Sequence, residues 1–247
     1  MIGRLFSSSD AWHATSSHSH KEGQLTFVTR GLVSMESEQG VWVVPQGQLA
    51  WVPPSVSHAS RSRGPTEGWL VSMPAHIARS LPTRVSVLYA SPLLLAALER
   101  VSTPQSDDVA LNLMLRRVIT HEIERTKAEP LGIALPTSPV LRAWAGRYMR
   151  APRVTMTIAT AATEVAMSRR SFTRHFELET GSTFSEWKRL VMTQHAIERL
   201  TIGDTVTTIS FELGYENPSA FIAMFKGVRK SAPRQFVKEL SASAHSG

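Results

Sequence analysis

The sequence predicts a two-domain α+β protein, in which an N-terminal β-barrel with flanking helices precedes an all-α domain with two helix-turn-helix units. Three observations predict it. Residues 24–70 contain short β-branched and aromatic runs separated by Gly and Pro, whereas residues 140–240 follow helical spacing with brief Gly or Pro breaks. Between these regions, Pro130, Pro136 and Pro139 mark a linker. The chain of 247 residues is long enough for two cores of ordinary size.

The first elements expected are short strands. The runs at residues 24–28, 41–44 and 49–52 are rich in Val, Leu and aromatic residues, and turn signals lie close to each run. Short strands that are separated by tight turns favour a small barrel or sandwich. We therefore assign residues 1–90 to this domain.

Two helices are expected over residues 91–135. The first begins at Pro92, a residue suited to a first helical turn. The second covers residues 107–127, where apolar residues recur at three- and four-residue steps. They are Leu111, Leu115, Val118, Ile119 and Ile123. This stripe either packs on the barrel or faces a second copy across a two-fold axis, and we favour the homodimer.

The positive charge is concentrated in the second part of the chain. Residues 1–139 hold 12 basic and 11 acidic side chains, and residues 140–247 hold 15 and 9, within a net charge of +7. A basic domain beside a neutral one favours a polyanionic partner. The chain has no cysteine, no secretory leader pattern and no apolar run that could span a membrane. We therefore expect a reducing, cytoplasmic location and no membrane partner.

The first helix-turn-helix unit covers residues 157–177. Its short first helix has an apolar stripe formed by Ile158, Ala161, Ala162 and Val165. Ser168 is a good N-cap for the second helix, in which Phe172 and Phe176 lie four apart and share one side. The opposite side carries Arg170, Thr173 and Arg174. Such a helix suits a DNA major groove, because Arg can pair with guanine O6 and N7.

The second unit covers residues 206–226. Gly214 falls where the chain must reverse, a position that favours a positive φ. Asn217 and Pro218 then suit the N-cap and first position of the next helix. The aromatic pair is repeated by Phe221 and Phe225. The outward face carries few side chains that can read a base: Ser219, Ala220, Ala223 and, near its edge, Lys226.

These units carry a resemblance to a known family. Its most diagnostic segments are residues 213–226 (LGYENPSAFIAMFK) and 167–176 (MSRRSFTRHF), joined by a long amphipathic helix expected over residues 184–200. Over residues 155–236 the chain closely resembles the AraC/XylS family of bacterial transcription regulators. We therefore assign residues 140–240 to an AraC-type DNA-binding domain.

The resemblance implies that the recognition helix of each unit enters one of two successive major grooves of double-stranded DNA. Carried over by position, the DNA-binding residues are Ser168, Arg169, Arg170, Thr173, Arg174, Asn217, Ser219, Ala220, Ala223 and Lys226. The first unit holds the guanine-reading side chains, whereas the second offers thymine-methyl and phosphate contacts. Transcription activation would also require a contact with RNA polymerase.

The chain departs from the family pattern at two places. Met192 stands where an Arg is usual, which removes a phosphate or structural contact. Arg229 and Lys230 stand where an apolar residue and Gly are usual, and this basic pair offers additional phosphate contacts. Neither departure affects the expected fold.

The N-terminal part resembles the cupin-type sensor domain of one AraC subgroup, in His18, His20, Gln24 and residues 42–58. Cupins place two such His residues, an acidic residue and a later His around a metal; here Gln24 holds the acidic position and His58 is the later His. If His18 and His20 share one face of a strand, the set is a candidate site for a divalent transition metal such as zinc, iron, nickel or copper. Alternatively, the imidazoles line an effector pocket or form only local hydrogen bonds.

A small-molecule effector is the second partner that the resemblance implies. The candidate lining residues are Phe27, Trp42, Trp51 and His58. An aromatic lining fits an apolar or aromatic effector, although each Trp can equally belong to the barrel core. The subgroup resemblance also implies control of a neighbouring efflux-transporter gene.

Two other function classes compete with an effector-responsive regulator. A metal-dependent cupin enzyme is disfavoured by Gln24 in the acidic position and by the two helix-turn-helix units. An architectural DNA binder is disfavoured by the neutral barrel, which DNA packaging does not require. No Ser-His-Asp set or Gly-rich phosphate loop stands out in the sequence. We therefore expect a regulator and assign no catalytic residue.

Overall fold

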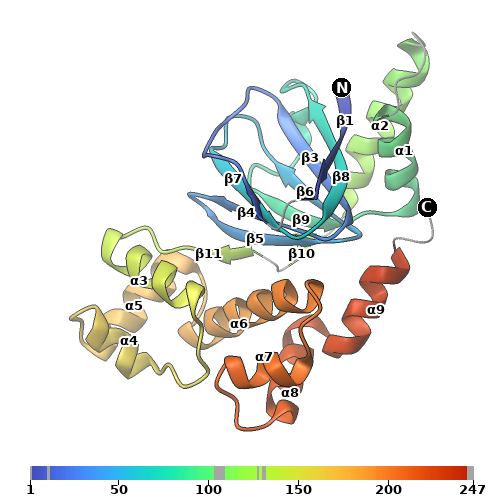
Figure 1. Cartoon of the computed structure of the whole chain (residues 1–247). Helices are drawn as coiled ribbons and strands as arrows, with labels where there is room; N and C mark the ends of the chain where they lie inside the picture. The colour runs from blue at the N-terminus through green and yellow to red at the C-terminus, as the bar shows by residue number, and fades with distance from the viewer. Residues whose placement is uncertain (1, 10–11, 103–108, 127, 130–131, 244–247) are drawn as a thin grey trace. The chain divides into compact units, whose positions relative to one another are not determined.

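The computed structural model of the protein describes residues 2–9, 12–102, 109–126, 128–129 and 132–243. The chain divides into two compact units, residues 1–132 with 240–247 and residues 133–239. The first unit contains the strands and the second is helical (Figure 1). The expected two-domain α+β class is therefore confirmed.

The first unit is built on two sheets, whose strand orders are β1-β8-β3-β6-β9-β10 and β11-β5-β4-β7-β2. The strands are β1 (Ile2–Ser8), β2 (Trp12–Ala14), β3 (Gly23–Arg30), β4 (Leu32–Ser37), β5 (Gly40–Pro45), β6 (Gln48–Val52), β7 (His58–Arg63), β8 (Thr66–Met73), β9 (Ser86–Tyr89), β10 (Ala128–Glu129) and β11 (Gly132–Ala134). Strand β11 carries the chain into the second unit. The described strands form two separate sheets and do not close into one barrel, which corrects the expected closed barrel.

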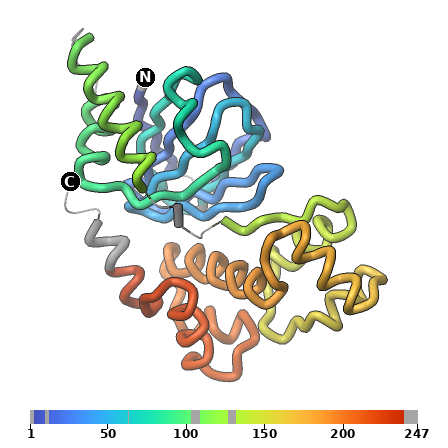
Figure 2. Tube along the Cα trace, turned by 180° about the vertical axis from the view of Figure 1, so that it is seen from behind, coloured from blue at the N-terminus to red at the C-terminus, as the bar shows by residue number. Residues whose placement is uncertain are grey.

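A large apolar core lies between the first sheet and two helices. These helices are α1 (Pro92–Ser102) and α2 (Val109–Arg125), which lie side by side in Figures 1 and 2; a short 3-10 helix, η1 (Ala78–Ser80), precedes them. The core contains Leu25, Phe27, Leu49, Trp51, Leu94, Leu98, Ile119 and Ile123. Because side chains alternate along a strand, β3 and β6 turn these residues towards the helices and their neighbours towards the other face of the sheet.

Helix α2 packs its apolar stripe on the core of the first unit, which is the alternative to the favoured dimer interface. The ends expected at Asp107 and Lys127 lie outside the described residues. Ile119 and Ile123 are buried in the core and Val118 packs against it, so these side chains do not face a partner. The exposed apolar side chains of α2 are instead Val109, Leu113 and Met114.

The second unit consists of helices that begin at well-defined caps. They are α3 (Pro139–Arg150), α4 (Ile158–Glu164), α5 (Arg169–Thr180), α6 (Phe184–Thr201), α7 (Val206–Glu212), α8 (Pro218–Arg229) and α9 (Pro233–Ser243). Helix α6 is the long helix expected over residues 184–200. Among the helices described in both units, none is long and apolar enough to cross a membrane.

The core of the first half of this unit is aromatic, and Trp144 of α3 lies at its centre. Its ring centroid lies 5.6–6.2 Å from four other buried rings, those of Phe172, Phe176, Phe184 and Trp187. The pairs with Phe172 and Phe176 are edge-to-face, an arrangement that stabilises a core beyond the area it buries. Helix α3 lies outside both helix-turn-helix units in the sequence, yet it holds α5 and α6 together.

Candidate nucleic-acid interface

The first helix-turn-helix unit is formed by α4 and α5. The turn passes through Ala166, whose φ of 54° lies in the left-handed region. Ser168 then caps α5, because its hydroxyl accepts a 3.1 Å hydrogen bond from the N–H of Ser171. Phe172 and Phe176 are both fully buried. The predicted N-cap and aromatic anchor of this helix are therefore confirmed.

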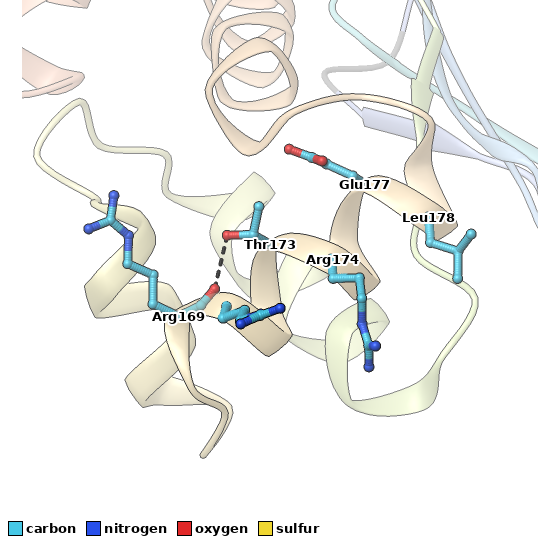
Figure 3. Close-up of a pocket in the computed structure, with 6 residues that line it drawn as sticks. Arg169, Thr173, Arg174, Glu177 and Leu178 are labelled. Atoms are coloured by element: carbon cyan, nitrogen blue, oxygen red, sulfur yellow. Dashed lines mark hydrogen bonds between the residues drawn. The ribbon is translucent and has the colours of Figure 1, made fainter.

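The solvent face of α5 forms a shallow, open depression. It is lined by Arg169, Arg170, Thr173, Arg174, Glu177 and Leu178 (Figure 3). In the described part of the chain, the guanidinium groups of its three Arg residues make no hydrogen bond or ion pair. Thr173 donates its hydroxyl to the carbonyl of Arg169, at 2.9 Å, so only the lone pairs of this hydroxyl remain for another group.

Two residues of this face, Glu177 and Leu178, were not predicted from the sequence. Glu177 lies four positions after Thr173, and Leu178 lies four positions after Arg174, so helical spacing alone places both beside the predicted residues. Leu178 is 80% exposed, which is unusual for a large apolar side chain. The recognition face therefore offers cations, one carboxylate and one apolar side chain.

The second unit is formed by α7 and α8. Gly214 has a φ of 83°, as its position at the chain reversal predicts. Asn217 caps α8 by accepting a 3.0 Å hydrogen bond from the N–H of Ala220. Phe221 and Phe225 are fully buried. The exposed positions are Ser219, Ala220, Ala223 and Lys226, so this face has a single cation.

A short series of hydrogen bonds fixes the two helix-turn-helix units relative to one another. The ammonium group of Lys188, on α6, donates to the carbonyls of Val154 and Met156, at 2.8 and 2.9 Å. The N–H of Val154 donates in turn to the carbonyl of Leu213, at the end of α7. Burial lowers the pKa of Lys188. This half-buried ammonium group links the segment before α4 to α6. Helix α6 lies between the two recognition helices along the chain.

The two departures from the family pattern have structural roles. Met192 is 1% exposed, and its sulfur lies 4.0 Å from the hydroxyl of Tyr215, so it fills core space between α6 and the second turn. Arg229 stacks over the ring of Phe236, at 4.8 Å from its centroid. Lys230 ends α8 in the left-handed region and donates to the carbonyl of Gly227. The expected phosphate contacts of Arg229 and Lys230 stay a prediction.

The residues expected to line an effector pocket separate into two groups. Phe27 and Trp51 belong to the core that packs on α1 and α2, and the indole N–H of Trp51 donates to the carbonyl of Pro82, at 2.7 Å. Trp42 and His58 lie on β5 and β7 of the other sheet, both almost fully buried. The four side chains therefore do not form one wall, because the two sheets place them in different layers.

The three expected metal-binding imidazoles do lie together. One ring nitrogen from each of His18, His20 and His58 lies within 4.8 Å of the others. His18 and His20 are in the segment before β3 and not within a strand, which corrects the expected placement. Gln24 is on β3, where its amide donates to Thr26. Burial, with a smaller contribution from the neighbouring imidazoles, lowers the pKa of His58, although its hydrogen bond to Val56 opposes the shift.

Two capped recognition helices, each anchored by a buried aromatic pair and joined by one long helix, define a DNA-binding protein of the double helix-turn-helix class. Residues 161–239 match the family described as a helix-turn-helix domain, and residues 4–127 match the AraC-like ligand binding domain. The chain belongs to the AraC family of DNA-binding transcriptional regulators, with an N-terminal ligand-binding domain.

Similar proteins include a regulator and two solved structures. The HTH-type transcriptional regulator NimR of Escherichia coli K12 is 27% identical over 229 residues, which cover 91% of this chain and 82% of NimR. ToxT of Vibrio cholerae O395 is 12% identical, covers 96% of this chain and 97% of its own, and has a TM-score of 0.41. The DNA-binding domain of the global transcriptional factor AdpA, solved with a target DNA, is 24% identical, covers 42% of this chain and 96% of its own, and has a TM-score of 0.40.

Proposed function

We propose that this regulator recognises its operator through α5, while α8 mainly docks on the DNA backbone. The observation that carries the proposal is the contrast between the two exposed faces. Helix α5 presents Arg169, Arg170 and Arg174 without intramolecular partners in the described chain, whereas α8 presents Pro, Ser and Ala at the corresponding positions. A guanidinium can pair with both guanine acceptors, but an Ala offers only a methyl contact.

The charge of the α5 face fits both kinds of DNA contact. Arg170 and Arg174 are four apart on one side of the helix, as base-reading side chains on a helix in the major groove must be. Arg169, in the first turn beside the cap at Ser168, is placed for a phosphate. The N-terminus of α8 offers a further phosphate the N–H of Ser219, because Pro218 has no N–H and that of Ala220 is bonded to Asn217.

Selection of bound DNA from a random pool by the full chain tests this proposal. We expect one enriched motif with G·C pairs in the half-site that α5 contacts, and affinity that falls with salt as counterions are released. The Arg170→Ala chain should lose preference at one base pair. Arg79→Ala, which removes the same charge from an exposed position of the first unit, is the matched control and should keep the motif. Enrichment of no motif would reject sequence-specific recognition.

We also propose that the first unit is a cupin-like sensor that binds a small effector between its two sheets. Gln48 supports this: it is 1% exposed, and neither atom of its amide has a hydrogen-bond partner in the described chain. Because side chains alternate along β6, Gln48 faces away from the core that contains Leu49 and Trp51. An unsatisfied buried amide is costly, so an effector with a polar group beside its apolar or aromatic part would stabilise it.

Thermal shift measurements with a library of small aromatic compounds test the effector site. A compound that stabilises the native chain should not stabilise Gln48→Leu, whose apolar side chain cannot bond to it. Gln46→Leu, in the nearby turn before β6, is the control and should respond as the native chain does. Equal shifts for native chain and Gln48→Leu would place the effector elsewhere.

The oligomeric state and the target gene complete the proposal. We propose a homodimer that uses the exposed apolar side chains Leu113 and Met114 of α2, which are 53% and 64% exposed. Light scattering on native chain and on Met114→Glu tests it, since a charge within an apolar interface should yield monomers. The proposed target is a neighbouring efflux-transporter gene, as the subgroup resemblance implies, and a footprint upstream of that gene tests it. Any activation would act through contact with RNA polymerase.

A further inference from the structure

Leu178, near the end of α5, is unusually exposed for a large apolar side chain. Its exposed fraction is 80%, whereas the other large apolar side chains described in the helical unit are at most 55% exposed. A single exposed apolar residue is common on protein surfaces. Its position on the helix therefore decides whether this residue has a function.

Leu178 continues the line of Arg170 and Arg174 along α5. Residues four apart lie one above the other on one side of a helix. The opposite side is marked by Phe172 and Phe176, which are fully buried. Figure 3 shows Arg174 and Leu178 on successive turns of the helix, and both line the same depression. Leu178 is therefore the direct neighbour of the guanidinium that is placed to read a guanine, about 6 Å further along the helix axis.

The last turn of α5 holds Leu178 in this position. Glu179 accepts a 2.9 Å hydrogen bond from the N–H of Ser138, before α3. The hydroxyl of Thr180 is buried and donates to the carbonyl of Phe176, at 2.7 Å. The inner side of this turn is thus attached to the rest of the helical unit. Its outer side presents Leu178 in a defined direction.

The major groove of DNA offers one apolar group to such a side chain, the 5-methyl group of thymine. The other groups that the base edges present there are hydrogen-bond donors and acceptors, with which a Leu side chain cannot pair. Contact between the isobutyl group and the thymine methyl removes apolar surface of both from water, which is favourable. Base pairs follow one another at about 3.4 Å, so a separation of about 6 Å corresponds to less than two base-pair steps.

The surroundings of Leu178 favour DNA over a protein partner. Three guanidinium groups line the same depression, and clustered Arg residues fit a polyanion. Leu178 is the one apolar side chain among the residues described as lining it. A single apolar side chain does not provide the contiguous apolar patch that marks a protein interface.

We propose that Leu178 is a specificity-determining residue, which contacts the methyl group of a thymine within two base pairs of the guanine that Arg174 reads. The inference rests on the proposed recognition of the operator by α5. Arg174 would select its base pair by hydrogen bonds, and Leu178 would select a T·A pair by its methyl group. Because Leu178 carries no charge, it adds preference for one sequence without adding affinity for the phosphates.

Replacement of thymine by deoxyuridine in the selected operator tests the contact, because this change removes only the methyl group. The position to change is a T·A pair close to the G·C pair at which Arg174→Ala relaxes the preference. We expect deoxyuridine to weaken binding of the native chain about three- to fivefold, the value of one buried methyl group. Leu178→Ala should bind the thymine operator more weakly by at least this factor and should no longer distinguish thymine from deoxyuridine.

Leu93→Ala is the matched control, because Leu93 is 57% exposed on α1 of the first unit. It should keep the full response to the methyl group. Equal binding of both operators by the native chain, or a response that persists in Leu178→Ala, would overturn the inference. Either result would leave recognition by α5 standing if Arg174→Ala still relaxes the motif, whereas enrichment of no motif would reject both proposals. Since Leu178 is exposed, its removal opens no core, and circular dichroism confirms that each variant is folded.

Discussion

The side-chain carboxylate of Glu179, near the end of α5, accepts a 2.9 Å hydrogen bond from the N–H of Ser138, which precedes α3. It accepts a second from the N–H of Thr137, also at 2.9 Å. The hydroxyl of Ser138 makes no capping bond of its own. The recognition helix therefore supplies the cap of α3, so DNA-binding geometry and the aromatic core around Trp144 depend on one another.

This cap should make stability depend on pH in the acid range. Burial raises the pKa of Glu179, but the hydrogen bonds from Ser138 and Thr137 outweigh it and hold the pKa below its ordinary value. The free energy that this cap contributes to folding is present above the unfolded-state pKa of Glu179 and is lost as the pH falls through its lower folded-state pKa. Glu179→Gln should cost about 0.5–1 kcal/mol at neutral pH, the value of an exposed cap.

Urea unfolding of the two chains from neutral pH to about pH 3.5 measures this effect. The difference in free energy of unfolding should shrink as the pH falls. Glu177→Gln, two positions away and without an intramolecular partner in the described chain, should behave as native at every pH. A difference that stays constant with pH would contradict the cap.

Arg174 and Ala223 test the asymmetry between the two units. Arg174→Ala should cost about 1–3 kcal/mol of operator affinity, because a bidentate guanine contact is lost. Ala223→Ser should change affinity by less than about 0.5 kcal/mol, as a small exposed substitution does. Gel shifts with operator and unrelated DNA at one salt concentration measure both. Equal losses for the two variants would reject the asymmetry.

Glu177 should contribute to base preference, although its negative charge is repelled by the DNA phosphates. A carboxylate in the major groove can accept from cytosine N4, while it repels the backbone. Glu177→Ala should therefore raise affinity for unrelated DNA and relax the preference at one base pair. Binding to operators changed at single positions shows this, and a variant whose preferences match the native chain at all positions would exclude the contact.

Met192 should behave as a core residue. It is 1% exposed beside Tyr215, and Met192→Ala should lower the free energy of unfolding by about 2–5 kcal/mol. Met192→Leu, which conserves volume, should cost less than about 1.5 kcal/mol. Denaturant unfolding compares the two. If Met192→Ala weakened DNA binding but left stability unchanged, the residue would act at the interface instead.

Local signals in the sequence were sufficient for both helix-turn-helix units. Each of their features depends only on neighbours within four residues along the chain. These features are the caps at Ser168 and Asn217, the reversal at Gly214 and the two aromatic pairs. The same spacing rule would have found Glu177 and Leu178. The grouping of His18, His20 and His58 followed from a resemblance, and the segment that carries the first two was wrongly expected to be a strand.

The sequence by itself therefore determined the two-domain class, the recognition helices and the charge contrast between them. Only the tertiary structure decided which face of each strand is buried, so Phe27 and Trp51 pack on α1 and α2 and not beside Trp42. It also decided that Ile119 belongs to the core and that Glu179 caps α3. These relationships join residues that are distant along the chain, and the free energy of packing that selects them depends on neighbours that no local pattern specifies.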